Sequence, residues 1–243
     1  KGVESSLLRL CGSGMRHALL LSVFVIASCG LAYELVAGAL SSYLLGDSVT
    51  QFSTVIGAYL FAMGVGSWLS KYIVRDLIGT FVRIELLVGL LGGFAALGLF
   101  LAFVWLPAPF RLLLYLAVFL IGVLVGLEIP LVMRILKREI EFKDLVSQVL
   151  TFDYLGALAV SLLFPLFLAP HLGMLRTGVL FGLLNVAVAL WALRLFADQL
   201  PARRWLTLQA WGVFVLLAAG FAGAVRFFFS SRRRHTSLQG DWS

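Results

Sequence analysis

Long apolar runs, separated by short polar connections, follow one another along almost the whole chain. Each run has about 20 residues or more, which is enough for an α-helix to cross a hydrocarbon layer about 30 Å thick. The pattern predicts about seven membrane-spanning helices, at residues 18–44, 50–70, 80–106, 111–136, 148–169, 174–197 and 205–229. We therefore expect an all-α membrane protein.

Two triplets of these predicted helices carry similar sequences. "LVGLLGGFAAL" at 87–97 matches "LFGLLNVAVAL" at 180–190, and "TVIGA" at 54–58 matches "DYLGA" at 153–157. Because a unit of three spans is odd, the second triplet would enter the membrane from the opposite side. The pattern predicts a 3+3 inverted-repeat bundle that resembles half of a major-facilitator carrier, with one extra helix and a binding site near the midplane.

Composition and charge support a membrane protein and argue against a nucleic-acid-binding protein. The chain is 61% hydrophobic and 13% charged, whereas a soluble domain is about half apolar and a quarter charged. The net charge of +7 does not indicate nucleic-acid binding, because no basic, water-facing domain is present. We expect contact with the lipid bilayer instead.

The basic residues gather on alternate connections between the predicted spans. Those on one side are Lys1, Arg9, Arg16, Lys71, Arg75, Arg83, Arg134, Lys137, Arg138, Lys143, Arg194, Arg203 and Arg204. The connections on the other side carry only Arg111 and Arg176. Because lysine and arginine mark cytoplasmic loops, we expect an integral protein of the bacterial inner membrane with a cytoplasmic N-terminus.

The chain divides into three parts. Residues 1–17 form a predicted N-terminal cytoplasmic segment, partly non-native if Met15 is the initiator. Residues 18–229 form the membrane domain. Residues 230–243, "SSRRRHTSLQGDWS", differ abruptly in composition from the apolar residues before them and resemble translated sequencing-adapter sequence.

Glu34 is the most conspicuous polar residue inside a predicted span. It lies four residues after Gly30 and four before Gly38, so all three share one helix face. Small residues on that face indicate helix packing, and we expect Glu34 to point into the bundle, with Tyr33 beside it. Two interpretations stay open: an acidic cavity that attracts a cation, or a protonated carboxyl group bonded to nearby backbone.

Four further polar residues complete the candidate substrate-binding set: Glu128, Asp153, Tyr154 and Asn185. Pro130 lacks an N–H and is predicted to disrupt the helix that carries Glu128, which would leave carbonyl groups free to line a site.

Three carboxylates have simpler structural explanations. Glu128 lies about two turns before Arg134 and Asp153 follows Lys143 near a helix start, so an ion pair is a plausible alternative for each. Glu85 follows Arg83 and is predicted to be an interfacial charge.

Sequence signals of catalysis and of metal or cofactor binding are absent. "GVGS" at 64–67 lies within a predicted span and does not follow a strand, so it is no dinucleotide loop. No histidine, cysteine and carboxylate spacing predicts a metal site, and no Ser–His–Asp set can be argued. We assign the chain no catalytic residue, metal or cofactor.

Several segments together resemble a known family. "SCGLAYELVAG", "LGDSVTQFSTVIGAYLFAMGVGSWLS", "GLEIPLVMR" and the stretch from "DYLGALAV" to "NVAVAL" occur in this order. They resemble the N-terminal transmembrane domain of membrane-integral spermidine synthase-like proteins, the polyamine aminopropyltransferases, over residues 15–225.

The resemblance implies that membrane attachment and catalysis belong to two different domains. In that family a multi-span domain precedes a cytosolic Rossmann-like domain, which transfers an aminopropyl group from decarboxylated S-adenosylmethionine to putrescine. This chain has no counterpart of the family's glycine-rich loop or catalytic aspartates, so we expect a missing C-terminal catalytic domain as its partner. We expect the membrane module to anchor the enzyme and to bind or pass a cationic polyamine. The alternatives are a stand-alone, transporter-like half-carrier without enzyme activity and a passive anchor.

Overall fold

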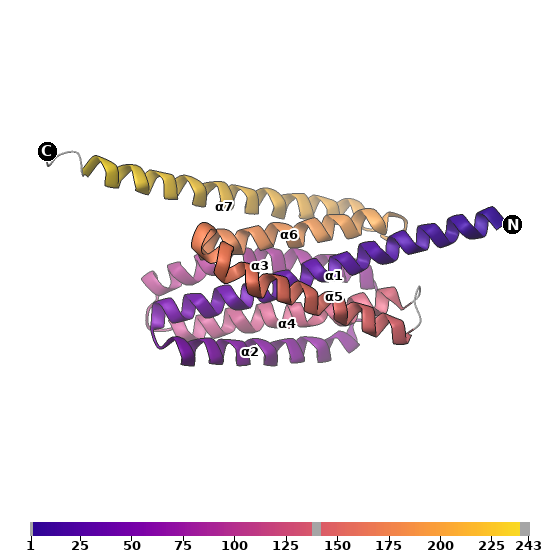
Figure 1. Cartoon of the computed structure of the whole chain (residues 1–243), viewed down its shortest axis with the longest axis horizontal. Helices are drawn as coiled ribbons and strands as arrows, with labels where there is room; N and C mark the ends of the chain where they lie inside the picture. Colours follow the sequence, from indigo (N-terminus) through magenta and orange to yellow (C-terminus); the bar gives the residue numbers. More distant parts are fainter. Residues whose placement is uncertain (1, 138–141, 239–243) are drawn as a thin grey trace.

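The part of the chain that the structure describes consists of helices joined by short connections and contains no strand. The computed structural model describes the backbone of residues 2–137 and 142–238, and the side chains of residues 17–137 and 143–223. The helices are α1 (Gly2–Leu45), α2 (Ser48–Leu69), α3 (Leu77–Trp105), α4 (Phe110–Leu136), α5 (Phe142–Leu163), α6 (Gly173–Leu195) and α7 (Arg203–Leu238). Consecutive helices run in opposite directions along roughly one axis (Figure 1). The predicted all-α class is confirmed. Of the predicted N-terminal segment 1–17 only residue 17 has a described side chain, and the side chains of the predicted tail 230–243 are not described.

Six stretches of the described residues are long and apolar enough to cross a membrane. They are His17–Leu45, Ser48–Tyr72, Leu77–Trp105, Phe110–Leu136, Lys143–Leu195 and Arg203–Gly223. The fifth stretch has 53 residues and covers the predicted span 148–169 and most of the predicted span 174–197. It is continuous because the chain between α5 and α6 is a π-helix, Phe164–Leu172, which covers the end of the predicted span 148–169 and most of the connection expected at 170–173.

Prolines account for this irregular segment. Pro165 and Pro170 lie within the π-helix, and a proline ring clashes with the preceding turn of a regular α-helix. Wider turns relieve that clash. Gly173 follows with a positive φ of 75°, and the chain reverses its direction between α5 and α6 (Figure 1).

Pro130 has a smaller effect than we had predicted. Helix α4 continues through Pro130 to Leu136, so the predicted disruption next to Glu128 is wrong. The two residues after Pro130, Leu131 and Val132, are buried, so α4 stays packed in the bundle through this turn.

Glycines set the closest helix crossings. Helices α3 and α6 meet at Gly89 and Gly182, where a Cβ added to Gly89 would lie 2.9 Å from the Gly182 carbonyl oxygen. Helices α2 and α4 meet in the same way, with Gly66 against the Val123 carbonyl group and Gly126 against that of Met63. Small residues therefore bring the backbones together, as expected for helices that pack in lipid.

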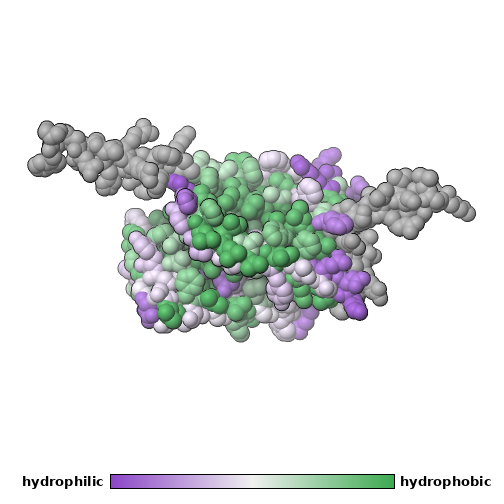
Figure 2. Space-filling view, in the orientation of Figure 1, coloured by the Kyte–Doolittle hydropathy of each residue, from purple (hydrophilic) through white to green (hydrophobic). Residues whose placement is uncertain are grey.

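Apolar side chains also cover the outside of the bundle. Figure 2 shows hydrophobic residues across the middle of one face and hydrophilic residues toward its ends. Exposed apolar residues occur on all seven α-helices, among them Leu21, Leu60, Leu87, Leu116, Leu158, Trp191 and Val215. Apolar surfaces this extensive are typical of proteins that contact a membrane or another protein.

Candidate functional site

Two carboxylic acids lie completely inside the bundle. Glu85 of α3 is 0% exposed and Glu128 of α4 is 1% exposed. Both oxygens of Glu85 and the Oε1 atom of Glu128 have no hydrogen-bond partner. Both acids are within electrostatic range of Cys29 and Tyr33 of α1, and Glu85 is within range of Glu128. The two carboxyl groups therefore share one region of the interior.

Helix crossings bring these residues together from distant parts of the chain. Glu85 lies one turn before Gly89, at the crossing of α3 with α6. Because α3 and α6 run antiparallel, Glu85 lies at the level of Asn185, one turn after Gly182. On the other side, Gly30 of α1 packs against Val125 of α4, 2.9 Å from an added Cβ, which places Glu128 beside the same part of α1.

Neutral polar groups complete this region. Asn185 is 0% exposed and neither its Oδ1 nor its Nδ2 atom has a hydrogen-bond partner. The ring of Tyr33 packs against Gly92, and its hydroxyl group is buried without a partner. The Cys29 thiol donates to the Phe181 carbonyl oxygen at 3.6 Å. We call Cys29, Tyr33, Glu85, Glu128 and Asn185 the buried acidic cluster.

The nearest arginines in sequence bind elsewhere. Arg83 Nη1 lies 3.5 Å from Asp76 Oδ2, and both side chains are about half exposed. Arg134 Nη1 donates to the Ser70 carbonyl oxygen at 2.8 Å. The prediction that Glu85 is an interfacial charge is therefore wrong, and the alternative ion pair of Glu128 with Arg134 does not form.

Glu34 points into the bundle, but toward α2. It is 8% exposed and lies between Gly30, which faces Tyr59, and Gly38, which packs against the ring of Phe52. The Tyr59 hydroxyl group donates to the Gly30 carbonyl oxygen at 2.8 Å. Tyr59 lies within electrostatic range of both Glu34 and Glu128, so Glu34 is adjacent to the buried acidic cluster without belonging to it.

The two candidates on α5 have different surroundings. Asp153 is partly buried and lies within electrostatic range of Glu128. Lys143 is exposed, and no ion pair joins it to Asp153 in the described part of the chain. Tyr154 is 67% exposed, so it lies on the outside of the bundle, away from the buried carboxyl groups. Consecutive helical residues point about 100° apart, and α5 turns Asp153 toward the bundle and Tyr154 away from it.

Sequence reasoning missed Glu85, although a signal was present. Glu85 and Gly89 are four residues apart and share a face with Ala96, the same spacing that identified Glu34. The neighbouring Arg83 made a surface position look more plausible. Among the described residues, no group of three or more histidine, cysteine and acidic side chains could hold a metal ion.

Comparison with curated proteins gives clear similarities. The chain is 62% identical to polyamine aminopropyltransferase 2 of Ralstonia nicotianae over 229 residues, which cover 92% of this chain and 44% of that protein. It is 55% identical to the polyamine aminopropyltransferase of Leptospira interrogans over 208 residues, 86% of this chain and 42% of that protein. The chain thus spans less than half the length of these relatives. No family model matches it, and no solved structure does.

Proposed function

We propose that this chain is the membrane module of a spermidine synthase-like polyamine aminopropyltransferase. Homologues of the chain are polyamine aminopropyltransferases, and the identity of 62% over 92% of this chain carries the proposal. The transfer of an aminopropyl group from decarboxylated S-adenosylmethionine to putrescine is then performed by the part of such enzymes that this chain does not match. Its own role is to anchor the enzyme and to bind the cationic polyamine.

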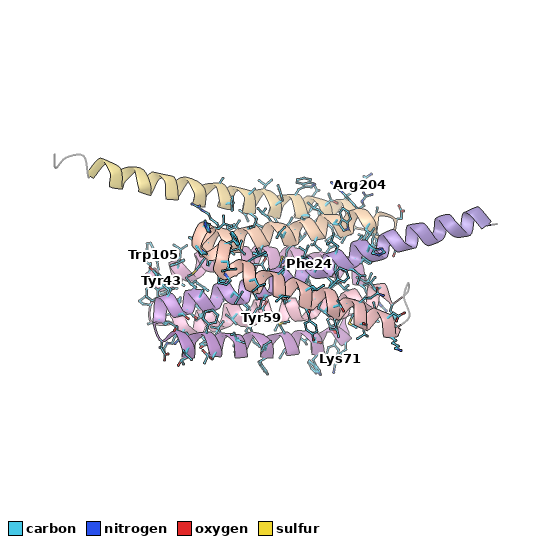
Figure 3. All side chains as sticks on the ribbon, in the orientation of Figure 1. Phe24, Tyr43, Tyr59, Lys71, Trp105 and Arg204 are labelled. Carbon is cyan, nitrogen blue, oxygen red and sulfur yellow. The ribbon has the colours of Figure 1, made fainter. Side chains whose placement is uncertain are left out.

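The surface of the bundle supports a location in the membrane. Two exposed aromatic residues, Tyr43 and Trp105, lie at one end of the bundle, and the basic residues Lys71 and Arg204 lie at the opposite end (Figure 3). Aromatic residues are enriched at membrane interfaces, and basic residues mark the cytoplasmic side. We therefore assign the end with Lys71 and Arg204 to the cytoplasm.

This orientation can be tested at the two ends of α2. In a Cys11→Ser background, we expect Ser48→Cys to react with a membrane-impermeant maleimide in spheroplasts. We expect Lys71→Cys to react only after permeabilisation, because a charged reagent does not cross the bilayer. The fraction of each cysteine variant that is labelled is measured by a gel shift. The Cys11→Ser protein without a new cysteine gives the baseline, because its Cys29 is buried. The reverse pattern would contradict the proposed orientation.

The buried faces of α3 and α6 support the proposed inverted repeat. A shift of 93 residues carries buried positions of α3 onto buried positions of α6: Glu85 onto Gly178, Gly89 onto Gly182, Gly92 onto Asn185 and Ala96 onto Ala189. Gly89 and Gly182 also contact each other's carbonyl oxygens reciprocally. Reciprocal contacts of equivalent residues are expected on a twofold axis.

The helix pairings follow the same symmetry. The proposed symmetry exchanges α1 with α4, α2 with α5 and α3 with α6. It therefore converts the pair α2–α4 into the pair α5–α1, and the pair α3–α4 into the pair α6–α1. All four pairs are in contact. We propose that α7 is the extra helix, and that the chain crosses the membrane seven times, with α5 and α6 as separate spans. A cytosolic catalytic domain joined to the far end of α7 then requires one more crossing.

Acidic groups inside the bundle support binding of a polycation. Glu34, Glu128 and Asp153 lie on three helices, and Tyr59 and Glu128 connect them electrostatically. Carboxylates inside membrane proteins mark pathways for cations. We propose that they provide the counter-charge for a polyamine.

A chimera tests the proposed function. We expect this chain to replace the matching region of the Ralstonia nicotianae protein with retention of carbonate-resistant membrane association and spermidine formation. Membrane fractionation and chromatography of the product from putrescine measure the two properties. Deletion of the matching region is the control and should release the protein from membranes. A soluble chimera contradicts the membrane role, whereas an inserted chimera without product contradicts the link to aminopropyl transfer.

A further inference from the structure

Among the residues whose side chains the structure describes, none balances the charge of the pair Glu85 and Glu128. The titratable side chains around it are Cys29 and Tyr33 of α1, Tyr59 of α2 and Asp153 of α5. All four are neutral or acidic. The arginines nearest in sequence, Arg83 and Arg134, bind Asp76 and Ser70 instead.

Two neighbouring carboxylates in a low-dielectric interior cannot both stay ionised without a counter-charge. A proton on one of them, or a bound cation, provides it. The packing favours a small ion over a polyamine chain, because Glu85, Glu128 and Asn185 are each at most 1% exposed.

The unpartnered atoms suit a hard cation. They include three carboxylate oxygens, the amide oxygen of Asn185 and the hydroxyl oxygen of Tyr33. Oxygen ligands of this kind are preferred by hard cations. Asn185 is an independent indication of a ligand, since an amide that is 0% exposed and without a partner costs free energy unless something binds it.

We propose that Glu85 and Glu128 bind one small monovalent cation, of the size of Na⁺ or NH₄⁺, with Asn185 and Tyr33 as neutral ligands. The cation replaces one proton, which leaves the carboxyl pair for the solvent, so the charge of the site is unchanged. This site shares Glu128 with the polyamine-binding role proposed above, whereas Glu34 and Asp153 lie outside it, and the chimera experiment does not depend on it.

Thermal unfolding of the full chain in lipid nanodiscs tests the site. We expect NaCl or NH₄Cl to raise the unfolding temperature relative to equimolar N-methylglucamine chloride, because a ligand that binds only the folded state stabilises it. Comparison of the two salts identifies the preferred ion. Glu85→Gln and Glu128→Gln should each weaken the apparent affinity about tenfold or more, because each removes a charged ligand.

Glu34→Gln is the matched control, since it removes a buried carboxyl group outside the pair and should leave the salt effect intact. Infrared difference spectra of the unaltered chain provide a second measurement that needs no variant. Exchange of N-methylglucamine for the cation should convert a protonated carboxyl band into carboxylate bands. The proposal would be overturned if NaCl or NH₄Cl still raised the unfolding temperature in both Gln variants. It would also be overturned if the unaltered chain showed neither the rise in unfolding temperature nor the change in its infrared bands.

Discussion

Gly66→Ala is expected to destabilise the bundle by about 2–3 kcal/mol, the upper part of the usual range for overpacked cores. A Cβ at this position would meet the Val123 carbonyl group and would lie 3.1 Å from the Cα atom of Gly126. Both obstacles are backbone atoms, so no side-chain rotation relieves the clash. Helices α2 and α4 would have to separate along their shared face.

Gly64→Ala is the matched control for this prediction. Gly64 lies in the same helix two residues earlier, and nothing lies within 4 Å of an added Cβ. Because alanine favours a helix over glycine by about 1 kcal/mol, stability should stay equal or rise slightly. Thermal labelling of Cys29, buried at 0% exposure, by a thiol-reactive dye in a Cys11→Ser background measures both variants. Equal unfolding temperatures would show that α2 and α4 do not meet at Gly66.

These two glycines show what the sequence could determine about the fold. Run length and hydropathy predicted the helices, because about 20 consecutive apolar residues are typical of one long apolar helix. Spacing of small residues predicted tight packing, but "GVGS" at 64–67 does not reveal which glycine faces a neighbour. That depends on the rotation of α2 against α4, which the structure shows to bury Gly66 and expose Gly64.

The candidate site was predictable where local spacing set the orientation. Glu34 faces the bundle because Gly30 and Gly38 need the same face for packing. Glu85 was misjudged because its sequence neighbour Arg83 suggested a surface position, whereas Arg83 binds Asp76 at the start of α3. Long-range pairing with Glu128 of α4 is a tertiary property, and no spacing within α3 encodes it.

Glu85→Met is expected to stabilise the folded chain while removing its response to small cations. Replacement of a buried ionic group by an apolar residue of similar volume is neutral or stabilising by about 1–4 kcal/mol. Methionine would remove two buried oxygens that have no hydrogen-bond partner, together with the repulsion from Glu128. A residue that costs stability is expected where function requires it.

The measurement is the unfolding temperature in nanodiscs with N-methylglucamine chloride and with NaCl. For Glu85→Met we expect a higher temperature than for the unaltered chain in N-methylglucamine chloride, and no further rise in NaCl. Glu34→Met should keep the rise in NaCl, since Glu34 faces α2. Glu85→Met could instead lower the unfolding temperature in both salts. The carboxyl group of Glu85 would then make a stabilising interaction within the protein, and the unbalanced charge of the pair with Glu128 would not explain why Glu85 is buried.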